Sequence, residues 1–469
     1  MFNNSVKNVK SSLFLLDKII NNTNIKEKPN IWKNQVLNVL SLSEHVSYTS
    51  PEIILLYKNV LLKSVLLWHV FYNKDSYGKL VTEAEAKLVN TENIASYPLL
   101  DKTFFKNFQD TSCNNTSVFR HDTSGSSGYT FFCLSWKDAF WIVENNNHYG
   151  KIRREFELEN SVTLATLMPC YDFTKQVREP IFVQDTDKVF FAVVKSSSNF
   201  FYSFNVSEFV DIVYNINKPT YYKSMPLFFE FFSKKNCDVF NLRGSFIKIL
   251  ARYVKDKNIA TKVGKLLCNT FESVDENDLF FLKDRGIFDN VCDHMRCCDG
   301  GGTFFTCKFG TYHLMEEVCH AISINEKFVS TDFFNFVWPF INYWNNDTCQ
   351  VEDNWFKCEC GRWYRPFKFC GRSSFVFKDK NLREITSADI SERCLHSATS
   401  YYAKVGLIQY QCYNGKIVIC TSEKVKEQHK SYLRKILYNF NVDFKTNEFI
   451  VSGQYNKVNR MVDCTKNGD

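Results

Sequence analysis

The chain has 469 residues and a mass of 55.0 kDa, enough for several domains with large cores at roughly 150 residues per domain. Hydrophobic residues make up 45% of it and aromatic residues 16%, and glycine and proline are scarce, which excludes a disordered or collagen-like chain. The net charge of +7 arises from 58 basic and 51 acidic residues scattered along the sequence. So weak a bias indicates neither a nucleic-acid nor a membrane partner.

The first residues, MFNNSVKNVKSS, contain neither the apolar segment nor the cleavage site of a secretory signal, so we expect a cytoplasmic protein. Most of the 18 cysteines are then expected to be reduced and buried, with a few available for metal. The most apolar early stretch, residues 53–72, is interrupted by Lys58, Lys63 and His69. We therefore predict a buried or amphipathic helix there, and no transmembrane segment.

The N-terminal part of the chain, residues 1 to about 90, has a helical pattern. Apolar residues recur at intervals of three and four in SLFLLDKII and again in VLLKSVLLWHV, which predicts a helical cap on the larger domain. From about 116 to 215, strand-like and helix-like segments alternate. We expect strands at 131–134 and 188–194 and a helix at 206–214. Alternation of this kind predicts an α/β core with a largely parallel sheet.

The C-terminal part of the chain has a different composition. Aromatic and β-branched residues dominate from 300 to 378, and from about 381 a polar segment leads into QYQCYNGKIVIC and the helix-like KVKEQHKSYLRKILYNF. A hairpin, a helix and a strand in this order predict a small α+β domain. We expect three parts: a helical cap (1–90), an α/β core (91–378) and a small mobile domain (379–469).

A run of six small or hydroxyl residues, 123–128, precedes the strand-like Tyr-Thr-Phe-Phe-Cys segment. Glycines let backbone N–H groups approach an anion, and hydroxyl groups add donors, so this segment is a candidate phosphate-binding loop. It is not a Walker motif, because no lysine follows the final glycine. The alternative is a flexible Ser/Gly turn.

The segment 123–128 resembles the first signature of the adenylate-forming ligases, in particular the phenylacetate–coenzyme A ligase branch, a Thr-Ser-Gly-Ser/Thr-Ser/Thr-Gly loop that grips the ATP phosphates. Residues 97–102 are similar to the Pro-x-x-x-Lys segment that precedes this loop, and 217–220, followed by helix-like 225–232, resemble the segment before the middle of the sheet. The resemblance implies a large N-terminal domain with mixed or parallel sheets and a small α+β domain. It also implies nucleotide binding by Thr123, Ser124, Gly125, Ser126, Ser127 and Gly128.

Further along, residues 295–301 lie where the family has a Tyr-Gly-x-Thr-Glu-Gly-Gly motif, of which this chain keeps the acid and the glycines. The resemblance implies that Asp299 holds magnesium, although it is one methylene shorter than the usual glutamate and Cys298 replaces a hydroxyl donor. A tight turn between strands is the alternative.

The segment from Ser330 to Asp347 resembles the family's "Thr-Asp-Leu-x-Asn … Pro-Leu-Ile-Arg-Tyr-x-x-Gly-Asp". In that motif the last aspartate binds the ribose hydroxyls, because a carboxylate accepts two hydrogen bonds at once. The resemblance assigns this role to Asp347. The chain departs from the motif at Asn342, where the family has arginine, and at Asn346, where it has glycine.

Next comes Cys358-Glu-Cys360-Gly-Arg and then Gly-Arg372, which resembles the family's "Cys-x-Cys-Gly-Arg … Gly-Arg" and implies that Arg372 contacts the nucleotide. Cys358 and Cys360, together with Cys307 and His313, supply four ligands of the types that zinc prefers. This branch often carries a structural zinc at such positions. The alternative is that they are ordinary core residues of a cysteine-rich chain.

The C-terminal segment 450–462 resembles the family's closing "Gly-Lys-x-x-Arg", in which a mobile domain inserts a lysine beside the carboxylate and the α-phosphate. Lys457 is the catalytic candidate, because a cation there stabilises the charge that develops during attack. Asn456 replaces the usual glycine. Without the resemblance, a lysine near a chain end is ordinarily only a solubilising residue.

The resemblance implies ATP- and Mg²⁺-dependent activation of a carboxylic acid as acyl-adenylate, with release of pyrophosphate, and then transfer to a thiol of coenzyme A or a carrier protein. Transfer to an amine is an alternative, and so is an inactive, zinc-stabilised relative that acts as a binding or scaffold protein. The region 220–300, where we expect the acid pocket, is rich in Phe, Cys and Leu, which favours an aromatic or other apolar acid. No nucleic-acid or membrane partner is expected, and the sequence does not indicate an oligomeric state.

Overall fold

The computed structural model describes most of the chain. The described residues are 2–22, 24–105, 118–122, 132–146, 149–158, 161–169, 189–197, 205–212, 221–235, 237–270, 274–296, 302–372, 376–386, 390, 408–421, 424–452, 457–458 and 461–465. They fall into two compact units that alternate along the sequence. The first takes its residues from Met1–Thr123, Phe131–Glu157 and His294–Cys370, and the second from Leu158–Asp293 and Gly371–Asp469.

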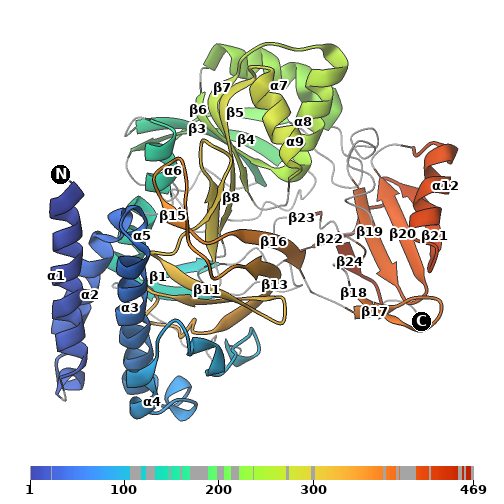
Figure 1. Ribbon diagram of the computed structural model, residues 1–469. Coiled ribbons are helices and arrows are strands. Elements are labelled where there is room, and N and C mark those ends of the chain that lie inside the picture. Colours follow the sequence, from blue (N-terminus) through green and yellow to red (C-terminus); the bar gives the residue numbers. More distant parts are fainter. Residues whose placement is uncertain are drawn as a thin grey trace. The chain divides into compact units, whose positions relative to one another are not determined.

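The first unit begins with helices, as predicted (Figure 1). Prolines occupy the first turns of two of them, and a capping box formed by Thr82 and Glu85 begins another, with the backbone N–H of Thr82 2.7 Å from Oε2 of Glu85. The helices are α1 (Phe2–Ile20), α2 (Pro29–Ser41), α3 (Pro51–Tyr72), α4 (Glu83–Leu88), α5 (Lys137–Asn146) and α6 (Tyr149–Glu155).

Helix α3 is the central helix of this group and matches the prediction for 53–72. By length and composition it could cross a membrane, yet 72% of its most apolar window is buried inside the protein. Its Trp68 packs edge-on against Trp32 of α2, with ring centroids 5.3 Å apart. Apolar residues on nearly all sides of a helix are expected for one that lies in a protein core.

The strands of the first unit form hairpins and a small sheet. A four-stranded sheet has the order β11-β12-β13-β16, and β14 and β15 form a short hairpin. β1 and β2 pair antiparallel from Val118↔Trp136 to Asp122↔Phe132, and the predicted phosphate loop follows β1 in the sequence. The bounds are β1 (Val118–Asp122), β2 (Phe132–Trp136), β9 (Thr303–Thr306), β10 (Tyr312–Leu314), β11 (Cys319–Ile324), β12 (Lys327–Asp332), β13 (Tyr343–Val351), β14 (Phe356–Lys357), β15 (Trp363–Tyr364) and β16 (Phe367–Arg372).

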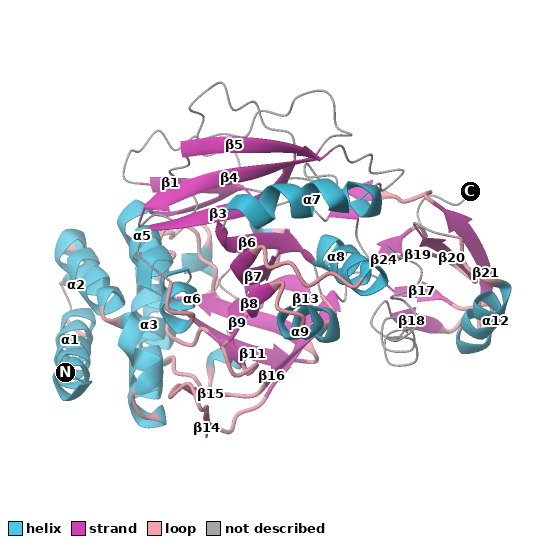
Figure 2. Cartoon of the chain, turned by 90° about the horizontal axis from the view of Figure 1, so that it is seen from above, coloured by secondary structure: helices cyan, strands magenta, loops and turns pink. Residues whose placement is uncertain are grey.

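The second unit contains the main α/β layer, with the strand sequence β8-β7-β6-β3-β4-β5. The pairs among β3, β6, β7 and β8 are parallel, whereas β4 and β5 add antiparallel strands, so the sheet is mixed. Figure 2 shows α7, α8 and α9 against this sheet, where a cluster of buried phenylalanines and leucines fills the interface. The elements are β3 (Ser161–Pro169), β4 (Val189–Ser197), β5 (Asn205–Ile212), α7 (Tyr221–Lys235), β6 (Cys237–Arg243), α8 (Gly244–Lys257), β7 (Gly264–Thr270), α9 (Glu276–Asp284) and β8 (Phe288–Arg296).

The helix predicted at 206–214 is wrong: this segment forms the strand β5, paired antiparallel with β4 from Val189↔Ile212 to Lys195↔Asn205. Val206, Phe209 and Val210 have helical spacing, but the segment is rich in β-branched residues and β4 presents an edge to it. Pairing with that edge satisfies the backbone groups, and tertiary context therefore overrides the local periodicity. The strands at 132–136 and 189–197 and the helix at 221–235 agree with the predictions.

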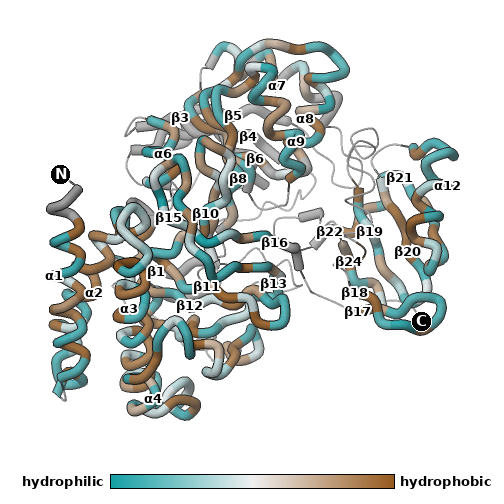
Figure 3. The backbone as a smooth tube through the Cα atoms, in the orientation of Figure 1, coloured by the Kyte–Doolittle hydropathy of each residue, from teal (hydrophilic) through white to brown (hydrophobic). Residues whose placement is uncertain are grey.

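The small C-terminal domain has the predicted hairpin, helix and strand. The loop Asn414-Gly415 joins β19 to β20, and Gly415 has a positive φ of 72°, which glycine adopts without strain. Leu433 of α12 and Leu437, the residue that caps this helix, pack in the core of the sheet β21-β20-β19-β24, whose strand β20 is largely hydrophobic in Figure 3. The elements are β17 (Val376–Lys378), β18 (Glu384–Thr386), β19 (Ile408–Tyr413), β20 (Lys416–Thr421), α12 (Glu427–Ile436), β21 (Asn441–Thr446), β22 (Val451–Ser452), β23 (Lys457–Val458) and β24 (Met461–Asp463).

The boundary expected after residue 378 lies at the end of β17, in the turn that leads to β18. The backbone N–H of Lys380 donates to the carbonyl of Asn439, and that of Gly415 donates to the carbonyl of Lys378. These bonds attach the segment to the small domain. The domain boundaries at 90 and 378 stay predictions, whereas the fold class, a large α/β domain with a small α+β domain, is as expected.

Candidate metal centre and nucleotide-binding residues

Two hairpins of the first unit have the same tight turn. In the β9–β10 hairpin the N–H of Gly310 donates to the carbonyl of Cys307 at 2.9 Å, and in the β14–β15 hairpin Gly361 donates to Cys358 at 2.9 Å. The two glycines have φ of 79° and 88°, a region in which a side chain is strained. Each turn therefore places a cysteine at its first position and a glycine at its fourth.

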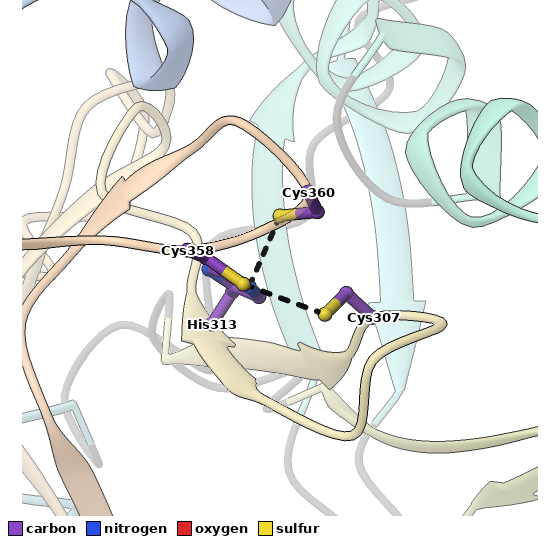
Figure 4. A group of neighbouring side chains, drawn as sticks. All are labelled: Cys307, His313, Cys358 and Cys360. Atoms are coloured by element: carbon purple, nitrogen blue, oxygen red, sulfur yellow. Dashed lines mark hydrogen bonds between the residues drawn. The ribbon is translucent and has the colours of Figure 1, made fainter.

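The two hairpins bring together the four predicted ligands, Cys307, His313, Cys358 and Cys360, and Figure 4 shows their side chains pointing toward one another. The four ligand atoms all lie within 4.8 Å of one another. Sγ of Cys307 is 3.8 Å from Sγ of Cys358, and Sγ of Cys360 is 3.4 Å from Nε2 of His313. The ligand atoms of Cys307 and Cys358, which are 51 positions apart in the sequence, thus lie in one cluster.

These distances fit a tetrahedrally coordinated zinc ion. Zn–S bonds of about 2.3 Å and a Zn–N bond of about 2.0 Å give edges of about 3.8 Å between sulfurs and about 3.5 Å between sulfur and nitrogen. The two measured separations agree with these edges, and three of the four ligands are buried. Three thiolates and one imidazole are a donor set that zinc favours over magnesium or calcium, which take oxygen.

The ligands also alter one another's protonation. The hydrogen bond from Cys360 lowers the pKa of the Cys307 thiol. Burial raises the pKa of Cys358, but its hydrogen bond with His313 and others outweigh burial, so the net shift is downward. Burial lowers the pKa of His313, and its contacts with Cys358 and Cys360 outweigh that effect and raise it. Two thiols are thereby biased toward the thiolate form that binds metal.

A buried ion pair supports both hairpins. Nη1 of Arg362 donates to Oε2 of Glu155 at 2.7 Å and lies 3.6 Å from Sγ of Cys360. Oε1 of Glu155 accepts the backbone N–H of Lys308, in the turn that begins at Cys307, at 3.2 Å. The guanidinium of Arg362 also lies over the ring of Tyr48, 4.9 Å from its centroid. One carboxylate on α6 therefore contacts both ligand-bearing hairpins.

A second buried charge cluster lies in the same unit. Arg365 grips Glu316 through two bonds of 2.7 and 3.1 Å, and Lys58 of α3 also contacts this carboxylate. Burial, followed by the charge of Arg365, lowers the pKa of Lys58 to about 8. The cluster joins α3 to the segment after β10 and to the residues after β15.

Glu155 could not be predicted from the sequence, and Arg362 had no predicted role. The arginine directly follows the Cys-x-Cys-Gly turn, which was a usable signal for a residue near the metal ligands. Glu155 lies in a charged helical segment, KIRREFELE, where nothing in the local pattern distinguishes a buried acid from an exposed one.

The predicted nucleotide-binding residues are placed only in part. The loop Thr123, Ser124, Gly125, Ser126, Ser127 and Gly128 lies outside the described residues, and so does Asp299. Arg372 ends β16 and Lys457 begins β23, and for both the description covers the backbone but not the side chain. The nucleotide-binding roles of these residues therefore stay predictions.

Asp347 is buried in β13, with 2% of its surface exposed. Its N–H donates to Oδ1 of Asn345 at 3.0 Å, and its carbonyl accepts from Nε1 of Trp344 at 3.0 Å. Asn346 has φ of 73° and Asn342 has φ of 47°, and asparagine tolerates this region better than most residues. The asparagine at 346 therefore keeps a backbone conformation that would suit the family's glycine.

No family model and no curated protein sequence matches the chain. Among solved structures, 2-hydroxyisobutyryl-CoA ligase in the postadenylation state, in complex with R3-HIB-AMP, is similar at a TM-score of 0.55 and 11% sequence identity. The likeness covers 92% of this chain and 90% of the ligase. The chain has the adenylate-forming ligase fold. The same ligase in complex with 2-HIB-AMP gives a TM-score of 0.53 at 12% identity over the same shares of the two chains.

The adenylate-forming ligase fold agrees with the two-domain architecture derived from the sequence. At 11 to 12% identity the likeness establishes the fold and leaves the substrate and the individual site residues open.

Proposed function

We propose that the protein activates a carboxylic acid with Mg-ATP and then transfers the acyl group to the thiol of coenzyme A. The observation that carries the proposal is the fold, which matches a ligase in its postadenylation state along nine-tenths of both chains. The complete Thr-Ser-Gly-Ser-Ser-Gly segment at 123–128 supports it independently, because it is a sequence motif and the likeness is one of backbone shape.

In the first half-reaction, a carboxylate oxygen attacks the α-phosphorus, the bond to the β-phosphate oxygen breaks, and pyrophosphate leaves. We assign the phosphates to residues 123–128, magnesium to Asp299, the ribose to Asp347 and a further nucleotide contact to Arg372. Lys457 is proposed to stabilise the charge on carboxylate and α-phosphate. In the second half-reaction a thiolate attacks the acyl carbon and AMP leaves.

The four-ligand cluster is proposed to hold a structural zinc ion. Cys307, His313, Cys358 and Cys360 fill a tetrahedral coordination shell, so no position is left for water or substrate. Zinc would there act as a cross-link between the β9–β10 and β14–β15 hairpins. Neither hairpin has a large core of its own, and β14 is exposed.

The proposal extends to the acid substrate and to the branch of adenylate-forming ligases. We propose a phenylacetate–coenzyme A ligase-like enzyme of the cytoplasm that takes an aromatic or other apolar acid. The ring-rich sequence between 220 and 300 supports this choice. A carrier-protein thiol or an amine in place of coenzyme A would change the second half-reaction only.

ATP–pyrophosphate isotope exchange tests the proposal. The purified chain is incubated with Mg-ATP, labelled pyrophosphate and a pool containing 2-hydroxyisobutyric, phenylacetic, benzoic and straight-chain fatty acids. We expect exchange that requires an acid, and splitting the pool then identifies that acid. Lys457→Ala should lower exchange by about 10²- to 10³-fold, because it removes a charge that acts in the transition state.

Matched controls separate chemistry from damage to the fold. Lys435→Ala removes an exposed lysine from α12 in the same small domain and should leave exchange unchanged. Asp347→Ala should raise the KM for ATP, whereas Asp443→Ala on β21 should not. If folded, zinc-loaded protein shows no exchange with any acid of the pool, the alternative of a catalytically inactive relative is favoured. The departures from the family's motifs at Asp299, Asn342 and Asn346 support that alternative.

A further inference from the structure

Two glutamines lie buried on β19, one of the two inner strands of the four-stranded sheet in the small domain. Gln409 and Gln411 of β19 are 0% and 4% exposed, respectively. A buried primary amide is costly unless its donors and acceptor find partners. Their partners therefore indicate what these two side chains hold in place.

The partners are backbone groups of the segment that precedes β22. Gln409 pairs with Ile450 on both sides: its Nε2 donates to the Ile450 carbonyl at 2.7 Å, and its Oε1 accepts the Ile450 N–H at 2.8 Å. Gln411 Nε2 donates to the carbonyl of Glu448 at 2.9 Å and to Oε1 of Gln409 at 3.1 Å. The side-chain amides of the two glutamines thus bond to the backbone of residues 448–450 much as a neighbouring β-strand would.

The segment held in this way leads directly to the strand that begins with Lys457. Val451 and Ser452 form β22, and Ser452 pairs with Lys457 of β23. On the other side of that hairpin, β24 pairs in parallel with β19, with Met461 opposite Tyr410. One strand, β19, thus anchors both ends of the β22–β23 hairpin, through its side chains at the entry and its backbone at the exit.

We propose that Gln409, supported by Gln411, is a positioning residue that fixes the β22–β23 hairpin and thereby Lys457 for the adenylation half-reaction. The inference rests on the role given above to Lys457. A lysine that acts on a transition state must be held within a fraction of an ångström, and a two-residue β pair is too short to be rigid by itself. The paired amides supply the missing constraint.

The test uses the full-length chain with Gln409→Glu. The variant keeps an acceptor for the Ile450 N–H but has no donor for the Ile450 carbonyl, and it places a carboxylate against that oxygen. Gln428→Glu, on the exposed face of α12, makes the same change of charge in the same domain and is the control. Both variants are first checked for a cooperative melting transition and an unchanged zinc content.

Hydrogen exchange measures the anchor without any substrate. In Gln409→Glu we expect the amides of Ile450, Val451 and Ser452 to exchange about 10- to 100-fold faster, because a buried hydrogen-bonded pair is lost. Amides of β20 and α12 should keep their rates, and Gln428→Glu should match the wild type. Unchanged exchange at Ile450 in Gln409→Glu would overturn the proposal.

The two half-reactions separate positioning from a general structural role. With the acid that supports exchange in the wild type, Gln409→Glu should lower ATP–pyrophosphate exchange at least tenfold through kcat with little change in KM. Thioester formation from the synthetic acyl-adenylate of that acid and coenzyme A should stay at the wild-type rate. Gln409→Glu combined with Lys457→Ala should be no slower than Lys457→Ala alone, because both act through one group.

Equal losses in both half-reactions, or additive losses in the double variant, would overturn the proposal and leave Gln409 as an ordinary stabilising residue. Normal adenylation by Gln409→Glu in the presence of an active wild type would do the same. An inactive wild type has a different meaning: the proposed function itself fails, and the positioning role falls with it, while hydrogen exchange still registers the anchor.

Discussion

The carboxylate of Glu155 and the guanidinium of Arg362 lie 2.7 Å apart, and both side chains are buried. The pair connects the last residue of α6 to the turn that carries Cys358 and Cys360, and the second oxygen of Glu155 reaches the turn that carries Cys307. Helix α6 and both ligand-bearing hairpins are therefore mechanically joined. Loss of either charge should affect the metal centre although neither residue is a ligand.

Arg362→Ala should lower the free energy of unfolding by about 3–5 kcal/mol, because it leaves the buried carboxylate of Glu155 without its counter-ion. Urea denaturation of the zinc-loaded protein measures this. Lys262→Ala breaks an ion pair of the same 2.7 Å length, to Asp289, in which both side chains are about half exposed, and it should cost under about 1 kcal/mol. Similar losses in the two variants would contradict the argument from burial.

The purified protein should contain about one zinc per chain, as four ligands in one tetrahedron bind one ion. Cys358→Ala should release the metal and lower the melting temperature. Cys349→Ala removes another buried thiol, on β13, and should retain the metal. Elemental analysis and a chelator titration make the measurement. Equal zinc content in both variants would show that the cluster does not hold zinc.

Gly361→Ala should destabilise the ligand turn and weaken zinc binding. An added Cβ would approach only the ring of Tyr48, at 3.7 Å, so the cost is conformational and amounts to about 1–2 kcal/mol at this positive φ. Gly286→Ala is a matched control, since Gly286 has φ of 69° with nothing within 4 Å of the added Cβ. We expect both variants to lose similar stability in urea and only Gly361→Ala to lose zinc affinity.

The stability of the protein should decrease between about pH 6.5 and pH 4 through His69. Burial lowers the pKa of this histidine on α3 to about 4, and its Nε2 lies 3.1 Å from the carbonyl of Asn335. In that pH window the unfolded chain binds a proton that the folded protein does not, so protonation favours unfolding as the pH falls. The loss amounts to roughly 2–3 kcal/mol.

His69→Gln removes this titration while it keeps a donor for the Asn335 carbonyl. Chemical denaturation at pH 7, 5.5 and 4 should show a flatter profile for the variant than for the wild type. Parallel profiles for the two proteins would contradict the assigned role of His69.

Much of the fold could be predicted from periodicity and turn chemistry. Local patterns were sufficient to predict the N-terminal helices, the hairpin around Asn414-Gly415 and the apolar helix at 51–72. Each of these elements depends on local residue spacing or on a residue with a special backbone preference. The segment 206–214 was not. Its side chains suit a helix and a strand alike, and the choice was made by β4, whose unpaired edge offered backbone partners.

Some features of the candidate metal centre could likewise be predicted from the sequence, and others could not. The four ligand types could be predicted from the sequence, since a soft donor atom is a property of a single residue. The two turns that begin at Cys307 and Cys358 were not predicted, although each contains a glycine that permits a positive φ. Three relationships could be read from the folded chain alone: Cys307 lies 3.8 Å from Cys358, Glu155 bonds to both hairpins, and Gln409 bonds to Ile450. Burial and partnership of polar groups depend on residues distant in the chain, and no local pattern encodes them.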